Sequence, residues 1–154
     1  MKSVVKILVV QGANMAYLGK RQPEIYGTTT TAELDDILHK HAGSRGYTLE
    51  IFYTHIEGEA IERIYRAIDD GIDGLVINAA GFLHAGFALR DCLRSFKPPL
   101  VEVHMSNIDK RGLHSVTAEA ARGIVAGFGI RSYLMGLDAV ARLVADERSA
   151  TDKA

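Results

Sequence analysis

Short runs of apolar and β-branched residues alternate along the chain with longer stretches in which apolar side chains recur every three or four positions. The short runs predict buried strands, and the longer stretches predict helices with one apolar face. The expected strands are residues 4–10, 48–53, 74–77, 100–104 and 130–134. The expected helices are residues 34–41, 61–68, 89–96, 118–128 and 137–144. This alternation is typical of a parallel sheet covered by helices on both faces.

Five such units predict an α/β fold of flavodoxin-like type, a three-layer sandwich around a five-stranded parallel sheet of order 2-1-3-4-5. We expect one catalytic domain over residues 1–146 and a frayed polar tail over residues 147–154. Ligands of such sheets bind outside the carboxyl ends of the strands, near the point where the strand order reverses. Polar residues at those strand ends are therefore the first candidates for a functional site.

Composition narrows the class of protein further. The chain has 154 residues, of which 47% are hydrophobic and 24% charged, and this length suffices for one buried core. The formal net charge is −1 and the basic residues are scattered, which argues against a nucleic-acid partner. No apolar stretch approaches the ~20 residues of a membrane span. The first apolar run contains Lys6 and lacks an Ala-x-Ala site, and Cys92 is the single cysteine, so we expect a cytoplasmic protein.

Amides and imidazoles follow three of the expected strands, within residues 11–14, 78–84 and 102–107. Glu102 and His104 are two positions apart in a strand, so their side chains point to the same face. A carboxylate beside an imidazole can orient the ring for general acid catalysis. The alternative is a structural contact at a strand end.

Other candidates each have a structural alternative. Asn14 and Asn78 are either ligand groups or turn formers. His84 stands where a helix is expected to open, and there it either meets an anionic group or is a surface residue. Residues 19–27 form a glycine-bounded segment with two cations and a tyrosine, which reads as a mobile lid or as a solvated basic loop.

Several reactive residue types are assigned to structural positions. Cys92 lies on an apolar helix face and is expected in the core rather than as a nucleophile. His39, His41 and His55 lack metal-ligand spacing, so no metal is expected. The chain contains neither a P-loop motif nor a dinucleotide fingerprint, so neither of these nucleotide sites is expected.

At these candidate residues the sequence resembles the type II 3-dehydroquinate dehydratases, from about residue 6 to residue 143. The most specific stretches are Leu-Gly-Lys-Arg-Gln-Pro-Glu-Ile-Tyr-Gly at 18–27, Ala-Leu-Arg-Asp at 88–91 and Glu-Val-His-Met-Ser-Asn at 102–107. The resemblance implies an anti elimination of water from 3-dehydroquinate that gives 3-dehydroshikimate through an enolate, without a cofactor. It also implies a place in the shikimate pathway for aromatic amino acid biosynthesis, or in quinate catabolism.

By the same resemblance, Tyr26 is the base and His104 is the acid. A tyrosine acts as a base near neutral pH only if cations stabilise its phenolate. Arg21 fits that role, and Arg111 can add to it.

The resemblance assigns supporting roles to further residues. Asn14 holds a water molecule or the enolate oxygen, and Glu102 orients His104. The residues expected to hold the substrate's hydroxyls and carboxylate are Asn78, His84, Met105, Ser106 and, in the altered loop, Arg111. Asp91 matches a residue that reaches a neighbouring subunit's site, since the family assembles from trimers into a dodecamer. A homo-oligomer is therefore expected.

The sequence departs from the family pattern at three places. Ala13 replaces a proline in the first motif, which loosens the turn that aims Asn14. Leu83 replaces a threonine before His84. The stretch after Asn107 is shorter and lacks an Glu-Phe-Arg run before residues 114–115, which removes an arginine that normally contacts a substrate hydroxyl. Lys110 and Arg111 remain in that loop.

These departures leave two functional readings open. One is a working dehydratase. The other is a divergent relative that acts on, or only binds, another small cyclic hydroxy-carboxylic acid. A structural or interaction protein is a third class, and it would have no need of a paired base and acid.

Overall fold

The computed structural model describes residues 2–154 and contains one five-stranded parallel sheet. Its strands are β1 (Lys6–Ala13), β2 (Thr48–Tyr53), β3 (Gly74–Ala80), β4 (Leu100–His104) and β5 (Gly123–Ala126). They are ordered β2-β1-β3-β4-β5, which confirms the order expected from the sequence. The chain therefore adopts a flavodoxin-like α/β fold whose strand order reverses beside β1.

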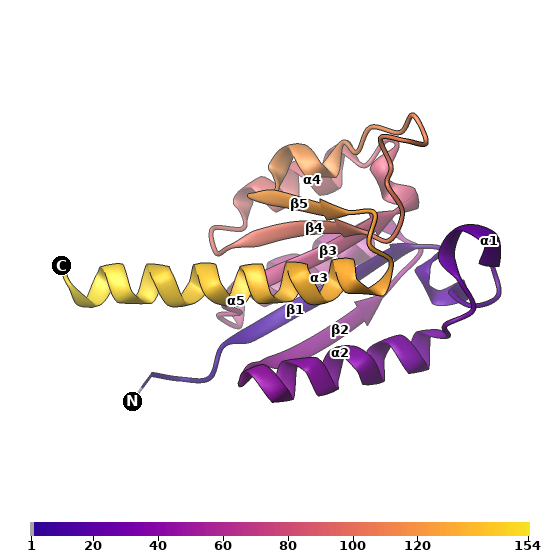
Figure 1. The fold of residues 1–154 in the computed structure, drawn as a ribbon. Coiled ribbons are helices and arrows are strands. Elements are labelled where there is room, and N and C mark those ends of the chain that lie inside the picture. The colour runs from indigo at the N-terminus through magenta and orange to yellow at the C-terminus, as the bar shows by residue number, and fades with distance from the viewer. Residues whose placement is uncertain (1) are drawn as a thin grey trace.

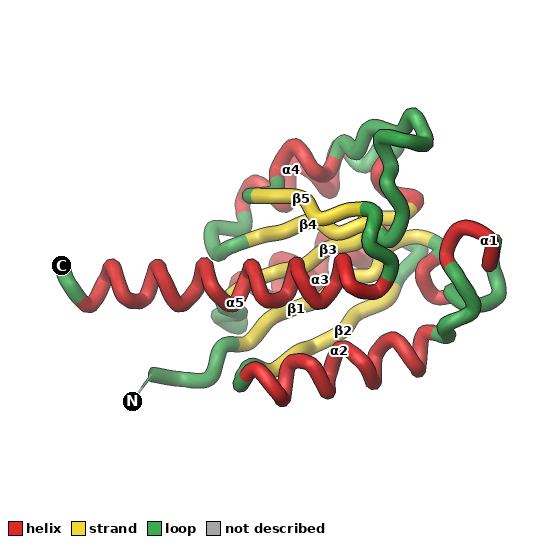
Figure 2. The backbone as a smooth tube through the Cα atoms, viewed as in Figure 1, coloured by secondary structure: helices red, strands yellow, loops and turns green. Residues whose placement is uncertain are grey.

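Helices cover both faces of this sheet (Figures 1 and 2). One face is covered by α2 (Thr31–Arg45) and α5 (Ile130–Asp152), and the other by α3 (Glu57–Asp69) and α4 (Phe87–Ser95). The short helix α1 (Pro23–Tyr26) lies beyond the arrowheads of the strands in Figure 1. Single 3-10 turns occur at Met15–Tyr17, Gly81–Leu83 and Thr117–Ala120.

The alternation of side chains along β1 builds a core on each side of the sheet. Ile7 and Val9 pack with the residues of α2 and α5, whereas Leu8 and Val10 pack with those of α3 and α4. All four side chains are completely buried. A strand buried on both faces needs a continuous apolar run, which is why the sequence predicts β1 so clearly.

Two strands extend further than their apolar runs. β1 continues through Ala13 and β3 through Ala80. In the parallel ladder, Gln11 pairs with both Tyr53 and Asn78, and Ala13 pairs with Ala80. Gln11 and Asn78, which were expected to follow these strands, therefore lie within them. As a result, their side-chain directions are fixed by the sheet.

The expected fifth strand at 130–134 and the expected helix at 118–128 are both wrong. Residues 130–134 are the first turns of α5, in which Tyr133, Leu137 and Val140 form one buried face. The strand is Gly123–Ala126 instead, where Val103 of β4 pairs with Val125. The free edge of β4 selects this short β-branched segment, a tertiary effect that helical spacing in the local sequence does not reveal.

Where a frayed tail was expected from residue 147, α5 continues through Asp152. Arg148 donates to the carbonyl of Ser3 at 2.7 Å and to Asp73 Oδ1 at 2.9 Å. These contacts bind the last turns of α5 to the segment before β1 and to the start of β3.

Candidate functional site

A cavity of about 320 Å³ opens at the carboxyl ends of the strands, beside α1. It is lined by Asn14, Met15, Leu18, Arg21, Tyr26, Asn78, Ala80, Gly81, Leu83, His84, His104, Met105, Ser106, Ile108, Arg111 and Leu113. Of the eleven expected site residues, only Glu102 and Asp91 are not among these. The segments after β1, β3 and β4 therefore meet around one cavity, as the fold predicts.

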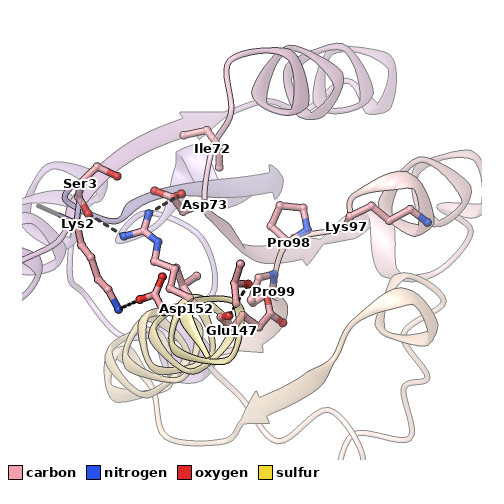
Figure 3. Close-up of a pocket in the computed structure, with 12 residues that line it drawn as sticks. Lys2, Ser3, Ile72, Asp73, Lys97, Pro98, Pro99, Glu147 and Asp152 are labelled. Carbon is pink, nitrogen blue, oxygen red and sulfur yellow. Dashed lines mark hydrogen bonds and ion pairs between the residues drawn. The ribbon is translucent and has the colours of Figure 1, made fainter. Parts of the chain in front are cut away.

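A larger cavity of about 540 Å³ lies at the other end of the sheet, between the start of the chain and the end of α5 (Figure 3). Four of its charged side chains form two ion pairs: Lys2 with Asp152 at 2.7 Å, and Arg148 with Asp73 at 2.9 Å. Lys97 and Glu147 also line it. This cavity has no convergent, unpaired acid and base, so the smaller cavity is the candidate active site.

Glu102 lies behind His104 rather than in the cavity. His104 Nε2 is 2.7 Å from Glu102 Oε2, and the two side chains are 4% and 0% exposed. The other carboxylate oxygen accepts a hydrogen bond from the hydroxyl of Thr117, which is 3.1 Å from the hydroxyl of Ser115. The buried carboxylate is thus hydrogen-bonded on both oxygens, and it fixes the orientation of the imidazole.

Tyr26 meets Arg111 across the cavity mouth. Arg111 Nη1 donates to the Tyr26 hydroxyl at 3.3 Å and to Ser106 Oγ at 2.9 Å. The guanidinium carbon lies 5.7 Å from the centre of the Tyr26 ring. Tyr26 is the last residue of α1, and Gly27, with φ 78°, ends that helix directly after it.

The two other cations considered from the sequence differ in position. Arg21 lines the cavity with Tyr26, but within residues 2–154 its side chain makes no hydrogen bond to that hydroxyl. Lys110 is exposed and does not line the cavity. Arg111 is therefore the cation of the shortened loop that reaches the site.

The turn at Asn14 is held without the proline of the family motif. Asn14 has φ 81°, a left-handed conformation that asparagine tolerates. Its backbone N–H donates to Nδ1 of His55 at 2.9 Å. A Cβ at Gly12 would lie 2.1 Å from the carbonyl oxygen of Ala79, so only glycine allows β1 to approach β3 this closely.

Asn78 is 4% exposed, and its amide is bonded inside the protein as well as lining the cavity. Nδ2 donates to the Tyr133 hydroxyl at 2.8 Å and lies 3.5 Å from Met15 Sδ. Oδ1 accepts from the backbone N–H of Ala80 at 3.0 Å. Asn78 can therefore both stabilise the local turn and bind a ligand, so the two interpretations of this residue are compatible.

His84 lines the cavity, but it does not open a helix, because α4 begins three residues later at Phe87. His84 therefore does not form the anion site that was expected at the start of a helix. Leu83 supplies an apolar part of the cavity wall, and its carbonyl accepts from the N–H of Val116 at 2.9 Å.

Two assignments fall outside this cavity. Asp91 is exposed on α4, where it contacts Arg90 and Arg94. Cys92 is buried, and burial raises the pKa of its thiol, as expected for a core residue rather than a nucleophile.

Sequence reasoning missed the residues that support the site from behind: Thr117, Ser115, His55 and Tyr133. His55 was assigned to a structural or surface position with no role. Thr117 and Tyr133 carry no local signal, since their function depends on contacts across 15 or more residues of sequence. Ser115 acts through Thr117, two positions away. Among the partners of these residues, Gln11 was noted in the sequence because it stands near the end of an expected strand.

The geometry brings a phenol beside a guanidinium and a carboxylate-bound imidazole to one cavity, a combination suited to removing a proton and returning one elsewhere. In the described part of the chain, no group of three or more His, Cys, Asp or Glu side chains could hold a metal. The family described as class II dehydroquinase matches residues 5–141. This chain belongs to the class II dehydroquinase family.

Similar proteins whose names are known are enzymes, which supports the assignment of this chain to an enzyme family. A 3-dehydroquinate dehydratase of Leptothrix cholodnii is 47% identical over 91% of this chain and 96% of that protein. One from Syntrophotalea carbinolica is 43% identical over 90% of this chain and 96% of that protein. The crystal structure of a type II dehydroquinase from Butyrivibrio crossotus matches with a TM-score of 0.88 and 33% identity, covering 91% of this chain and 99% of that one. Among residues 2–154, no helix has both the length and the apolarity to cross a membrane.

Proposed function

We propose that this class II dehydroquinase converts 3-dehydroquinate to 3-dehydroshikimate, by anti elimination of water through an enolate and without a cofactor. The observation that carries the proposal is the convergence of Tyr26, paired with Arg111, and His104, paired with Glu102, on one cavity. A base and an acid from different segments are what an elimination with two separate proton transfers requires.

Tyr26 takes the proton from the carbon next to the substrate ketone. Arg111 places positive charge beside the oxygen that takes this proton, with Nη1 3.3 Å from the hydroxyl. Arg21, on the same cavity wall, adds positive charge.

The electron pair left on that carbon moves toward the ketone and makes an enolate. Asn14, whose left-handed turn is fixed by His55, holds the enolate oxygen directly or through a water molecule. A hydrogen-bond donor placed in advance at such an oxygen stabilises the charge as it develops.

His104 then gives a proton to the departing hydroxyl, which leaves as water as the carbon–carbon double bond forms. Glu102 occupies Nε2, so Nδ1 is the ring nitrogen that handles the proton. Thr117 donates to Glu102 and holds the carboxylate in place. The ring therefore keeps its position while the proton leaves Nδ1.

The substrate's hydroxyls and carboxylate are held by Asn78, His84, the backbone at Met105 and the hydroxyl of Ser106, all on the cavity wall. Arg111 supplies the cationic contact of the shortened loop, and it is preoriented by Ser106 at 2.9 Å. An ionic contact to a substrate oxygen in a partly closed site contributes more than one in open water.

We also propose that the chain assembles with copies of itself, as trimers that form a dodecamer. Asp91 supports this proposal because it points outward from α4 and cannot serve the cavity of its own chain. Exposed Ile124, Phe128 and Met135 give the region around β5 an apolar surface that an assembly would cover.

The test is the rise in enone absorbance when purified protein is mixed with 3-dehydroquinate. Wild type is compared with Tyr26→Phe and with Tyr17→Phe, whose ring is 58% exposed and lies outside the cavity lining. The expected result is a rise in wild type and in Tyr17→Phe, and none in Tyr26→Phe.

No rise in a folded wild-type oligomer would contradict the proposal. It would favour the second reading, in which Leu83 and the shortened loop fit another small cyclic hydroxy-carboxylic acid.

A further inference from the structure

The hydroxyl of Tyr133 connects the cavity residue Asn78 to Gln11 in the middle of the sheet. Tyr133 donates to Gln11 Oε1 at 2.7 Å and accepts from Asn78 Nδ2 at 2.8 Å. Tyr133 and Gln11 are completely buried, and Asn78 is 4% exposed. Water therefore has little access to replace either of these hydrogen bonds.

The donor and the acceptor of each of these hydrogen bonds can be assigned, starting from Ala80. The backbone N–H of Ala80 can only donate, so the atom of Asn78 that faces it, at 3.0 Å, is the oxygen Oδ1. Asn78 must then turn Nδ2 toward Tyr133. A phenol has one hydrogen, and with its lone pair facing Asn78 that hydrogen goes to Gln11.

Gln11 holds this orientation at a cost. Its Nε2 is buried and has no hydrogen-bond partner among residues 2–154. A buried amide donor without a partner is unfavourable, and such groups in native structures call for an explanation. The other end of the same amide, Oε1, is the acceptor for the hydroxyl of Tyr133.

The arrangement leaves one hydrogen of Asn78 for a ligand. The amide has two N–H groups, of which one is bound by Tyr133 and the other faces Met15 Sδ at 3.5 Å. A thioether is a weak acceptor, so a hydroxyl or carboxylate oxygen in the cavity displaces it readily. If the amide were flipped, its oxygen would face the cavity and this donor would be lost.

We infer that Tyr133 and Gln11 are positioning residues, which fix the amide of Asn78 so that its Nδ2 donates to a hydroxyl or carboxylate oxygen of the substrate. The identity of that substrate rests on the proposed function, whereas the orientation of Asn78 does not. Ala80 shares in the effect: it lines the cavity with φ 47° and ψ −124°, and the Asn78 oxygen holds its N–H.

The test compares Tyr133→Phe with Tyr47→Phe. Tyr47 is a matched control because it is 5% exposed, and its hydroxyl also makes a hydrogen bond, to Asp138 Oδ1 at 3.0 Å, but outside the cavity lining. Tyr133→Phe is expected to lower kcat/KM by roughly 10- to 100-fold, mainly through KM, because the misplaced amide no longer orients the substrate. Tyr47→Phe is expected to leave kcat/KM within about twofold of wild type.

A second set of variants separates positioning from general damage. In an Asn78→Ala background, Tyr133→Phe is expected to have little further effect on kcat/KM, since it acts through Asn78. Gln11→Met, which removes the acceptor and the unpaired donor together, is expected to resemble Tyr133→Phe in KM. Equal losses in Tyr133→Phe and Tyr47→Phe, or a full effect without Asn78, would overturn the inference.

Crystal structures of wild type and Tyr133→Phe give a readout that does not need the reaction. The contact between Ala80 N and Asn78 Oδ1 is expected in wild type. In the variant Nδ2 has lost the Tyr133 hydroxyl as its acceptor, so the amide is expected to rotate and break this contact. If wild type does not dehydrate 3-dehydroquinate but the contact is lost, the proposed function fails and the positioning stands. If the contact is unchanged in an active enzyme, the positioning fails and the function stands.

Discussion

Arg111 Nη1 donates to the hydroxyl of Tyr26 at 3.3 Å, although the two residues are 85 positions apart in sequence. Tyr26 ends a one-turn helix in the segment after β1, and Arg111 belongs to the segment after β4. The contact therefore joins two of the three segments that surround the cavity. It also places the positive charge where a phenolate would form.

Replacing Arg111 by methionine is expected to lower kcat by about 10- to 100-fold. A hydrogen bond to a charged group contributes about 1.5–3 kcal/mol, and each 1.4 kcal/mol is a factor of ten in rate. Lys110→Met is the control, because it removes a cation from the same loop but outside the cavity lining. Steady-state kinetics on 3-dehydroquinate check this expectation, and similar losses in both variants would show that general loop charge, not the contact to Tyr26, is responsible.

Replacing His55 by alanine is expected to lower both the stability and kcat/KM. Nδ1 of His55 accepts the N–H of Asn14, and its loss leaves that donor unpaired and the left-handed turn less restrained. We expect a cost of about 1 kcal/mol in the free energy of unfolding. His39→Ala, on the exposed side of α2, provides the comparison in denaturant unfolding and in kinetics. An unchanged kcat/KM in His55→Ala would mean that the turn holds Asn14 without this bond.

Replacing Thr117 by valine is expected to lower kcat more than it changes KM. The change removes the hydrogen bond to a fully buried Glu102, whose other oxygen orients His104. Leaving a buried charged acceptor less satisfied costs about 1–3 kcal/mol or more. Thr151→Val, on the exposed end of α5, is the matched control. A raised KM with normal kcat would place Thr117 in substrate binding rather than in support of the acid.

Alkaline pH is expected to destabilise the fold through three tyrosines. Burial is the main cause that raises the pKa values of Tyr47, Tyr53 and Tyr133, and hydrogen bonds to Asp138 and Asp35 raise those of the first two further. The unfolded chain releases these protons near pH 10, whereas the folded chain retains them. Their contribution to stability is therefore complete below about pH 10 and is lost as the pH rises above it.

Above that pH the free energy of unfolding is expected to fall by up to about 4 kcal/mol per pH unit for the three groups together. Urea unfolding followed at several pH values, with tyrosinate absorbance as a second probe, measures the slope. Tyr47→Phe is expected to reduce the slope by about a third. A slope near zero between pH 10 and 11 would contradict the assignment.

The first four strands could be predicted from the sequence because each is a short run of mainly apolar residues. Polar side chains at the end of these runs marked the edge of the sheet where the cavity lies. The prediction failed at β5, where Gly123–Ala126 pairs with an edge that only the assembled sheet provides. The sequence indicated most of the residues that line the cavity. It did not indicate which hydrogen bonds hold their side chains in place. Arg111 and Lys110 could not be distinguished in the shortened loop, and the hydroxyls of Thr117 and Tyr133 gave no local pattern, because their partners come from other strands.

Both ends of the chain lie at the side of the sheet away from α1 (Figure 1), where Lys2 and Asp152 form an ion pair of 2.7 Å. A short peptide could therefore join the two ends, and the chain could be reopened at the exposed turn of residues 70–71, outside the cavity lining. Circular permutants of this kind would keep Arg148 bonded to Ser3 and Asp73. A protein immobilised through either terminus would likewise present the candidate active site beside α1 to the solution.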